Sequence, residues 1–160
     1  MLFSGEDPVS IHTLAMASFR ILRDLAEHQG DNSFLMDTRS LIRPGEERRF
    51  WGGLQSFSNF LKHADRDPDA VKENIDEKTN DAILHFVTEL YATLGNDLTP
   101  EMRVLKYWFI GKNSHLLKDD PESIQFKEVA EMFSPDLRGL SRAEELAKGA
   151  EYLAMAKSRK

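Results

Sequence analysis

Apolar residues recur along this chain at intervals of three and four, the spacing that gives an α-helix one buried face. The first run follows Asp7 and includes Ile11, Leu14, Leu22 and Leu25, which we expect in one buried stripe. Further runs predict helices over about 46–64, 77–94, 100–112, 121–133 and 142–157. No segment alternates apolar and polar residues over enough positions to indicate a β-strand. The pattern therefore predicts an all-α fold, a bundle of about six helices.

Capping residues mark the start of several of these runs. A residue that can cap a helix precedes a proline at Asp7, Asp67, Thr99 and Asp120. A side-chain oxygen of Asp or Thr accepts a hydrogen bond from the first helical turn, and a proline at the first position has no N–H to satisfy. Ser141 and Glu144 have the spacing of a capping box. These positions predict where the helices begin.

Two adjacent glycines, Gly52 and Gly53, fall inside the second predicted helix. Each glycine costs about 1 kcal/mol relative to alanine in a helix interior. That cost predicts a close helix–helix crossing or a kink at this pair.

Length and composition narrow the class of protein. With 160 residues, we expect a single helical domain over 1–160. The absence of cysteine excludes disulfides and thiolate metal sites and fits a reducing cytoplasm. No stretch approaches the roughly 20 apolar residues of a membrane helix, so we expect a cytoplasmic protein without membrane contact. A net charge of −6 argues against non-specific binding of duplex nucleic acid.

The negative charge is concentrated in one stretch. Residues 65–81 hold seven acidic and three basic side chains, which accounts for −4 of the net charge of −6. This stretch directly follows His63, at the end of the second predicted helix. The junction is therefore the first place to look for a site.

Six residues at this junction form a candidate ligand or polar site: Asn59, Lys62, His63, Asp65, Arg66 and Asp67. Within this set, His63, Asp65 and Asp67 are the candidate metal ligands, because imidazole and carboxylates are ligands of hard and borderline cations. The alternative is a capped helix junction. In that case Lys62, His63 and Arg66 complement the helix C-terminus, while Asp67 caps the next helix.

The five histidines show no zinc-binding pair, because none lies three to five residues from another. We expect His12 on the polar side of the first helix. A site built from His12, His63 and His85 across packed helices is geometrically possible, but the sequence requires no cofactor.

Arg23 and His28 resemble the Arg–His motif of HEPN-type nucleases, an all-α and often dimeric family that acts on RNA. The resemblance implies an alternative nuclease pair on the first helix. About one match of this kind is expected by chance in a chain of this composition. The alternative interpretation places both residues on the solvated side of the helix.

A broader resemblance is carried by three segments: His12–Ala15, Ile21–Leu25 and the run Asn59-Phe60-Leu61-Lys62-His63-Ala64-Asp65-Arg66-Asp67. Together they resemble a family of small bacterial proteins, over most of the first 115 residues. The resemblance implies an all-α fold and a bacterial origin, and it implies no particular activity.

Large aromatic residues at Phe50-Trp51 and Tyr107-Trp108-Phe109 cover more than one helix face, which fits either central helices or a homodimer surface. Our first hypothesis is a non-enzymatic module, in homodimeric form, that binds a protein partner or a small ligand. The alternatives are a metal-dependent hydrolase that uses His63 with Asp65 and Asp67, and an HEPN-like ribonuclease that uses Arg23 and His28. The substrate, the ligand and the partner cannot be read from the sequence.

Overall fold

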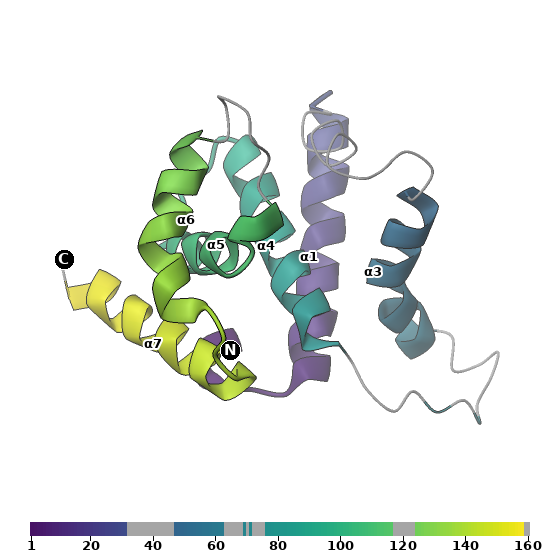
Figure 1. The fold of residues 1–160 in the computed structure, drawn as a ribbon. Helices are drawn as coiled ribbons and strands as arrows, with labels where there is room; N and C mark the ends of the chain where they lie inside the picture. The colour runs from purple at the N-terminus through teal and green to yellow at the C-terminus, as the bar shows by residue number, and fades with distance from the viewer. Residues whose placement is uncertain (32–46, 63–68, 70, 72–75, 117–123, 159–160) are drawn as a thin grey trace. The chain divides into compact units, whose positions relative to one another are not determined.

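The computed structural model describes residues 1–31, 47–62, 69, 71, 76–116 and 124–158, and within these ranges no strand occurs. The α-helices there are α1 (Pro8–His28), α3 (Glu47–Lys62), α4 (Glu77–Thr93), α5 (Pro100–Lys112), α6 (Ile124–Leu137) and α7 (Arg142–Ser158) (Figure 1). Two short 3-10 helices, η1 (Leu2–Ser4) and η2 (Ser114–Leu116), accompany them. Each predicted helix corresponds to one of these α-helices, and the all-α class is confirmed.

The chain divides into two compact units. Unit 1 combines Met1–Glu6 with Asp97–Lys160, and unit 2 is Asp7–Asn96. Unit 2 therefore contains α1, α3 and α4, while unit 1 contains η1, α5, η2, α6 and α7. The expected single domain over 1–160 stays a prediction.

The predicted caps at the starts of α1, α5 and α7 are confirmed. The Asp7 carboxylate accepts a hydrogen bond from the backbone N–H of Ser10 at 2.8 Å. The Thr99 hydroxyl accepts one from the N–H of Met102 at 3.3 Å. At α7 the box is reciprocal, because Ser141 N–H donates to the Glu144 carboxylate and Glu144 N–H donates to the Ser141 hydroxyl. The starts predicted at Asp67 and Asp120 lie outside the described residues.

The core of unit 2 forms where α1 packs along α4 (Figure 1). Its buried members are Ala15, Met16, Phe19 and Ala26 of α1 and Ile83, Val87 and Leu90 of α4. Helix α3 adds Trp51, whose ring stacks on Phe19 with the centroids 6.1 Å apart. The three helices of unit 2 thus share one apolar core, as the helical spacing of their apolar residues requires.

The glycine pair in α3 does not mark a helix crossing, so the predicted close approach is wrong. Both Gly52 and Gly53 are exposed, and a Cβ added at either would meet no atom within 4 Å. The second predicted helix nevertheless forms as one continuous element over Glu47–Lys62. Its buried side chains, such as Phe57, hold it against α1 despite the glycines.

Close approaches occur instead at two glycines of unit 1. A Cβ added at Gly111 of α5 would lie 2.7 Å from Cβ of Phe133 on α6. A Cβ added at Gly149 of α7 would collide with the ring of Phe3 in η1. At Gly111 the close atoms are the Cβ and backbone of Phe133, so α6 itself would have to shift, whereas at Gly149 the ring of Phe3 would have to move. These glycines therefore set how closely α6 approaches α5 and η1 approaches α7.

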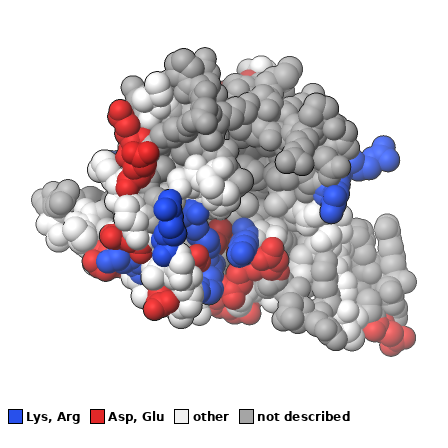
Figure 2. Space-filling model, viewed as in Figure 1, with Lys and Arg blue, Asp and Glu red and all other residues white. Residues whose placement is uncertain are grey.

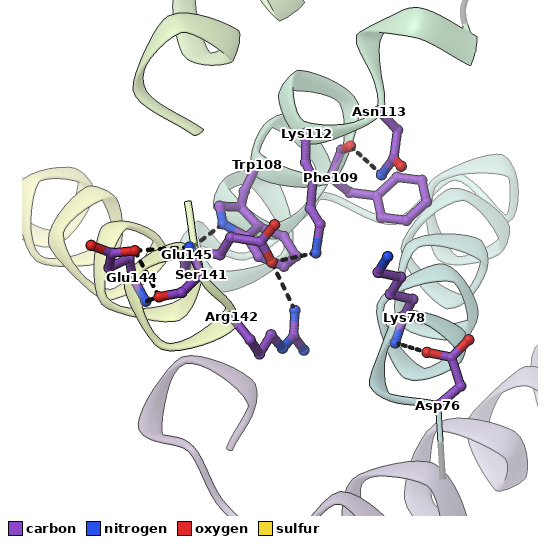
Figure 3. Close-up of polar contacts among 10 residues, drawn as sticks. All are labelled: Asp76, Lys78, Trp108, Phe109, Lys112, Asn113, Ser141, Arg142, Glu144 and Glu145. Carbon is purple, nitrogen blue, oxygen red and sulfur yellow. Dashed lines mark hydrogen bonds and ion pairs between the residues drawn. The ribbon is translucent and has the colours of Figure 1, made fainter. Parts of the chain in front are cut away.

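Trp108 of α5 is the centre of unit 1, with none of its surface exposed. Its indole N–H donates to the backbone carbonyl of Glu145 on α7 at 2.9 Å (Figure 3). The ring of Phe3 meets the indole edge-on, with the centroids 5.4 Å apart. Trp108 thus connects η1, α5 and α7, as a buried indole does when its N–H has an acceptor.

Helix α6 ends four residues later than predicted. The apolar pattern places its end at Phe133, whereas the helix continues through Pro135 to Leu137. Proline removes one backbone hydrogen bond inside a helix. Leu137 is only 2% exposed, and its burial next to Gly111 of α5 offsets that loss. The predicted start of this helix, residues 121–123, lies outside the described residues.

Candidate functional site

The residues of the predicted site are only partly described. Asn59 and Lys62 lie in the last turn of α3, and both are exposed. His63, Asp65, Arg66 and Asp67 lie outside the described residues, so the metal or polar site stays a prediction. Among the residues that are described, no three His, Asp or Glu side chains converge as metal ligands.

Arg23 and His28 do not come together within the chain. A separation of five residues places them roughly 140° apart around the axis of α1. The Arg23 guanidinium donates to Oδ1 of Asp24 through Nε at 3.1 Å and through Nη2 at 2.7 Å. His28 is exposed in the last turn of α1. The nuclease pair therefore needs a second copy of the chain, and it stays a prediction.

His12 is fully buried, which contradicts the expectation that it lies on the polar side of the first helix. It shares the core face of α1 with Ala15, Met16 and Phe19, which follow at i+3, i+4 and i+7. This spacing in the sequence was enough to predict that His12 is buried. We predicted the polar side of the helix for His12 because histidine is a polar residue, although its spacing from Ala15, Met16 and Phe19 favours the core.

Asn80 of α4 fixes the orientation of the His12 ring. The Asn80 amide nitrogen donates to the carbonyl of Pro8 at 2.9 Å. Its oxygen Oδ1 therefore faces His12 Nδ1, 2.9 Å away. An amide oxygen only accepts hydrogen bonds, so Nδ1 must carry the proton. The pair joins the first turn of α1 to α4.

Helix α3 completes the surroundings of His12. The ring of Phe57 meets the imidazole edge-on, with the centroids 5.2 Å apart. About two helical turns later along α1, the Arg20 guanidinium donates to the buried Ser58 hydroxyl at 3.3 Å. These contacts position the three helices of unit 2. Because His12 has no exposed surface, the cluster is structural in this conformation.

Glu101 and Tyr152 are among the ionisable groups of unit 1 whose pKa values are shifted by neighbouring side chains or by burial. The Lys157 ammonium, 2.7 Å from the Glu101 carboxylate, lowers the pKa of Glu101 to about 2. Burial raises the pKa of the Tyr152 phenol, and its hydrogen bond to Asp136 at 3.0 Å adds to the shift. Shifted pKa values often mark active sites, but ion pairs and burial between packed helices produce them as well.

Basic and acidic side chains are interspersed on the face shown in Figure 2. In unit 1, Lys112 and Arg142 both pair with the Glu145 carboxylate, beside the ring of Trp108 (Figure 3). Lys148 pairs with Glu151 at 2.8 Å. These cations are thus engaged by carboxylates of their own unit. None of the described helices combines the length and apolar character needed to cross a membrane.

Helix α1 presents an exposed apolar surface, which includes two residues, Leu14 and Leu25, that were predicted to lie in the buried stripe. Leu14 is 54% exposed, Ile21 61% and Leu25 46%. They lie within a sector of roughly 40°, opposite the buried face of α1. The buried face is centred on Ala15, Phe19 and Ala26, so the stripe predicted for Leu14 and Leu25 is wrong.

Small and uncharged residues complete this surface. We call it the α1 face, and it consists of Leu14, Ala17, Ser18, Ile21, Leu25 and His28, all exposed. It carries no Asp, Glu, Lys or Arg. Charged residues begin on one side of it, at Arg20 and Asp24. An apolar strip with a charged border is typical of a helix that packs against another helix.

No protein-family model, curated protein or solved structure matches this chain. The resemblance to a family of small bacterial proteins therefore stays a prediction, and function must be argued from the residues.

Proposed function

We propose that this chain is a non-enzymatic helical module that binds a protein partner, and that a second copy of the chain is this partner. The observation that carries the proposal is the α1 face. Three large apolar side chains on one helix stay about half exposed there, while the other face of α1 is fully packed.

Burial of these side chains provides the driving force. Complete burial of a Leu or Ile side chain contributes about 1.5–3 kcal/mol, so the half-exposed ones retain roughly 1 kcal/mol each. Ala17 and Ser18 lie between them and allow another helix to approach. A homodimer is the commonest oligomer among soluble proteins, and it needs only one such face.

The contacts of two residues that were considered for a site, His12 and Arg23, also support a non-enzymatic role. His12 is buried against Asn80 and Phe57, and Arg23 is paired with Asp24. The hydrolase at His63 and the ribonuclease at His28 stay alternative predictions. A cytoplasmic location and a bacterial origin stay predictions as well.

Sedimentation equilibrium over a range of protein concentrations tests the proposal. We expect the mass of the wild-type protein to rise from the 18.3 kDa of one chain toward twice that value. Ile21→Lys should keep the monomer mass at every concentration, because a charge on the α1 face opposes its burial.

The matched control is Met132→Lys on α6, which changes an exposed apolar residue that belongs to unit 1 and not to the α1 face. It should dimerise like the wild type. Wild-type protein that stays monomeric at the highest soluble concentration contradicts the proposal. Equal loss of dimer in both variants would contradict the assignment to the α1 face.

A further inference from the structure

We propose that two copies of α1 pack antiparallel about a two-fold axis at Ile21, and that Arg20 of each copy pairs with Asp24 of the other. This inference rests on the proposed function and specifies the geometry of the same surface. Its evidence is the order of large, small and charged residues along α1.

The α1 face is complementary to itself in this register. With the axis at Ile21, each Ile21 meets Ile21 of the second copy. Residues equally far from the axis then face each other, so Leu25 lies against Ala17 of the second copy. Leu14 lies against His28 of the second copy. Large side chains thus meet small ones next to the axis, which allows the helices to interlock.

The charges beside the face favour the antiparallel orientation. Arg20 and Asp24 lie on the same side of the α1 face, one turn apart. In an antiparallel pair this side faces the same side of the second copy. Each Arg20 then lies about 3 Å along the helix axis from Asp24 of that copy. The two Arg20 residues approach each other equally closely, so two attractive contacts outweigh one repulsive contact. In a parallel pair it would face the other side, where Ser18 and Leu22 carry no charge. Only the antiparallel pair gains two symmetric ion pairs.

Contacts within unit 2 hold both charged groups near this border. The Asp24 side chain is 63% exposed, and both hydrogen bonds from Arg23 reach its Oδ1. The Arg20 side chain is anchored by its hydrogen bond to Ser58. Residues that are already ordered lose less conformational entropy when they bind.

The size of the α1 face predicts a weak, concentration-dependent dimer. Leu14 and Leu25 are about 17 Å apart along the helix. One helix pair of this length buries less than the roughly 800 Å² per partner of a standard interface. The monomer and the dimer should therefore exchange within the concentration range of sedimentation experiments.

Cysteine cross-linking tests the register directly, because the chain contains no cysteine. Under mild oxidation, Ile21→Cys should give a disulfide-linked dimer, since the two Cβ atoms meet at the axis. Leu14→Cys is the matched control on the same face. Its two copies would lie roughly 21 Å apart, too far for a disulfide. A mixture of Ala17→Cys and Leu25→Cys chains should cross-link more than either chain alone.

A charge exchange tests the ion pairs. Arg20→Glu should weaken the dimer severalfold, because two carboxylates then face each other. Arg20→Glu combined with Asp24→Arg should restore it, although the contact with Ser58 is lost. If Arg20 acted only through its contact with Ser58 in its own chain, the exchanged charges would not restore dimerisation.

The outcomes separate this geometry from the proposed function. A dimeric wild type in which Leu14→Cys cross-links as well as Ile21→Cys overturns the register and leaves the proposed function intact. A dimer without rescue by the exchanged charges overturns the antiparallel pairing. A monomeric wild type overturns both, and the α1 face would then serve a different protein.

Discussion

The Nδ1–H of His12 donates to Oδ1 of Asn80 over 2.9 Å, although 68 residues separate the two positions in the chain. Both side chains are buried, and the Asn80 amide nitrogen also donates to the Pro8 carbonyl. One asparagine thus satisfies two polar groups of α1. A buried hydrogen-bonding group that loses its partner costs more than the pair contributed.

We therefore expect Asn80→Ala to lower the free energy of unfolding by about 1–3 kcal/mol. The substitution removes the acceptor of His12 and the donor to Pro8 together. Urea denaturation followed by circular dichroism measures the change. Asn59→Ala, an exposed position on α3, is the control and should change stability by less than about 0.5 kcal/mol. Equal effects of both variants would show that the buried pair is not stabilising.

Alanine at the α3 glycines should stabilise the protein. A Cβ at Gly52 or Gly53 meets no atom within 4 Å, so only the backbone preference changes. We expect each of Gly52→Ala and Gly53→Ala to raise the free energy of unfolding by about 1 kcal/mol. Thermal unfolding followed at 222 nm measures it. A loss of stability at either position would reveal packing against the exposed side of α3.

The same substitution at Gly111 should have the opposite sign. Its new Cβ would lie 2.7 Å from Cβ of Phe133, which cannot yield without a shift of α6. Overpacking of this kind costs about 1–3 kcal/mol. Comparison of Gly111→Ala with Gly53→Ala in one denaturation series separates helix preference from packing. Equal stabilisation by both would contradict the close approach of α5 and α6.

Acid should remove the contribution of the Glu101–Lys157 ion pair. The folded-state pKa of Glu101 is about 2, below its ordinary value of 4.5, so the pair stabilises the fold above pH 4.5. This contribution is lost as the pH falls from about 4.5 to about 2. Glu101→Gln should therefore be less stable than the wild type at neutral pH and equally stable near pH 2. Melting temperatures measured across this range test it, and a constant difference would contradict the assignment.

Features that depend on neighbouring residues in the chain were predictable from the sequence. The caps Asp7, Thr99 and Ser141 each accept a hydrogen bond from the amide three residues later, so the local sequence contains the whole interaction. The helices were predictable for the same reason, because apolar residues spaced three and four apart define one helix face. Within the described residues, the class of fold and the helix starts that could be compared are therefore confirmed.

Features that depend on distant segments were not predictable. His12 resembles a surface residue until α4 supplies Asn80, and Leu14 resembles a core residue until the packed face of α1 is known. The glycine pair in α3 suggested a crossing, whereas the crossings lie at Gly111 and Gly149. In each case the deciding neighbour lies on another helix. The candidate site at His63 lies outside the described residues and stays a prediction.

Unit 1 is built from two segments that lie far apart in the sequence, and this affects the order in which the chain can fold. The first six residues belong with the segment that starts at Asp97, and the 90 residues of Asp7–Asn96 stand between them. During synthesis, unit 2 is complete before α5 and α7 have left the ribosome. The contacts of Phe3 with Trp108 and Gly149 can therefore form only after these two later residues have been translated. Unit 1 therefore closes between segments translated before and after unit 2, and α1 can fold before that closure takes place.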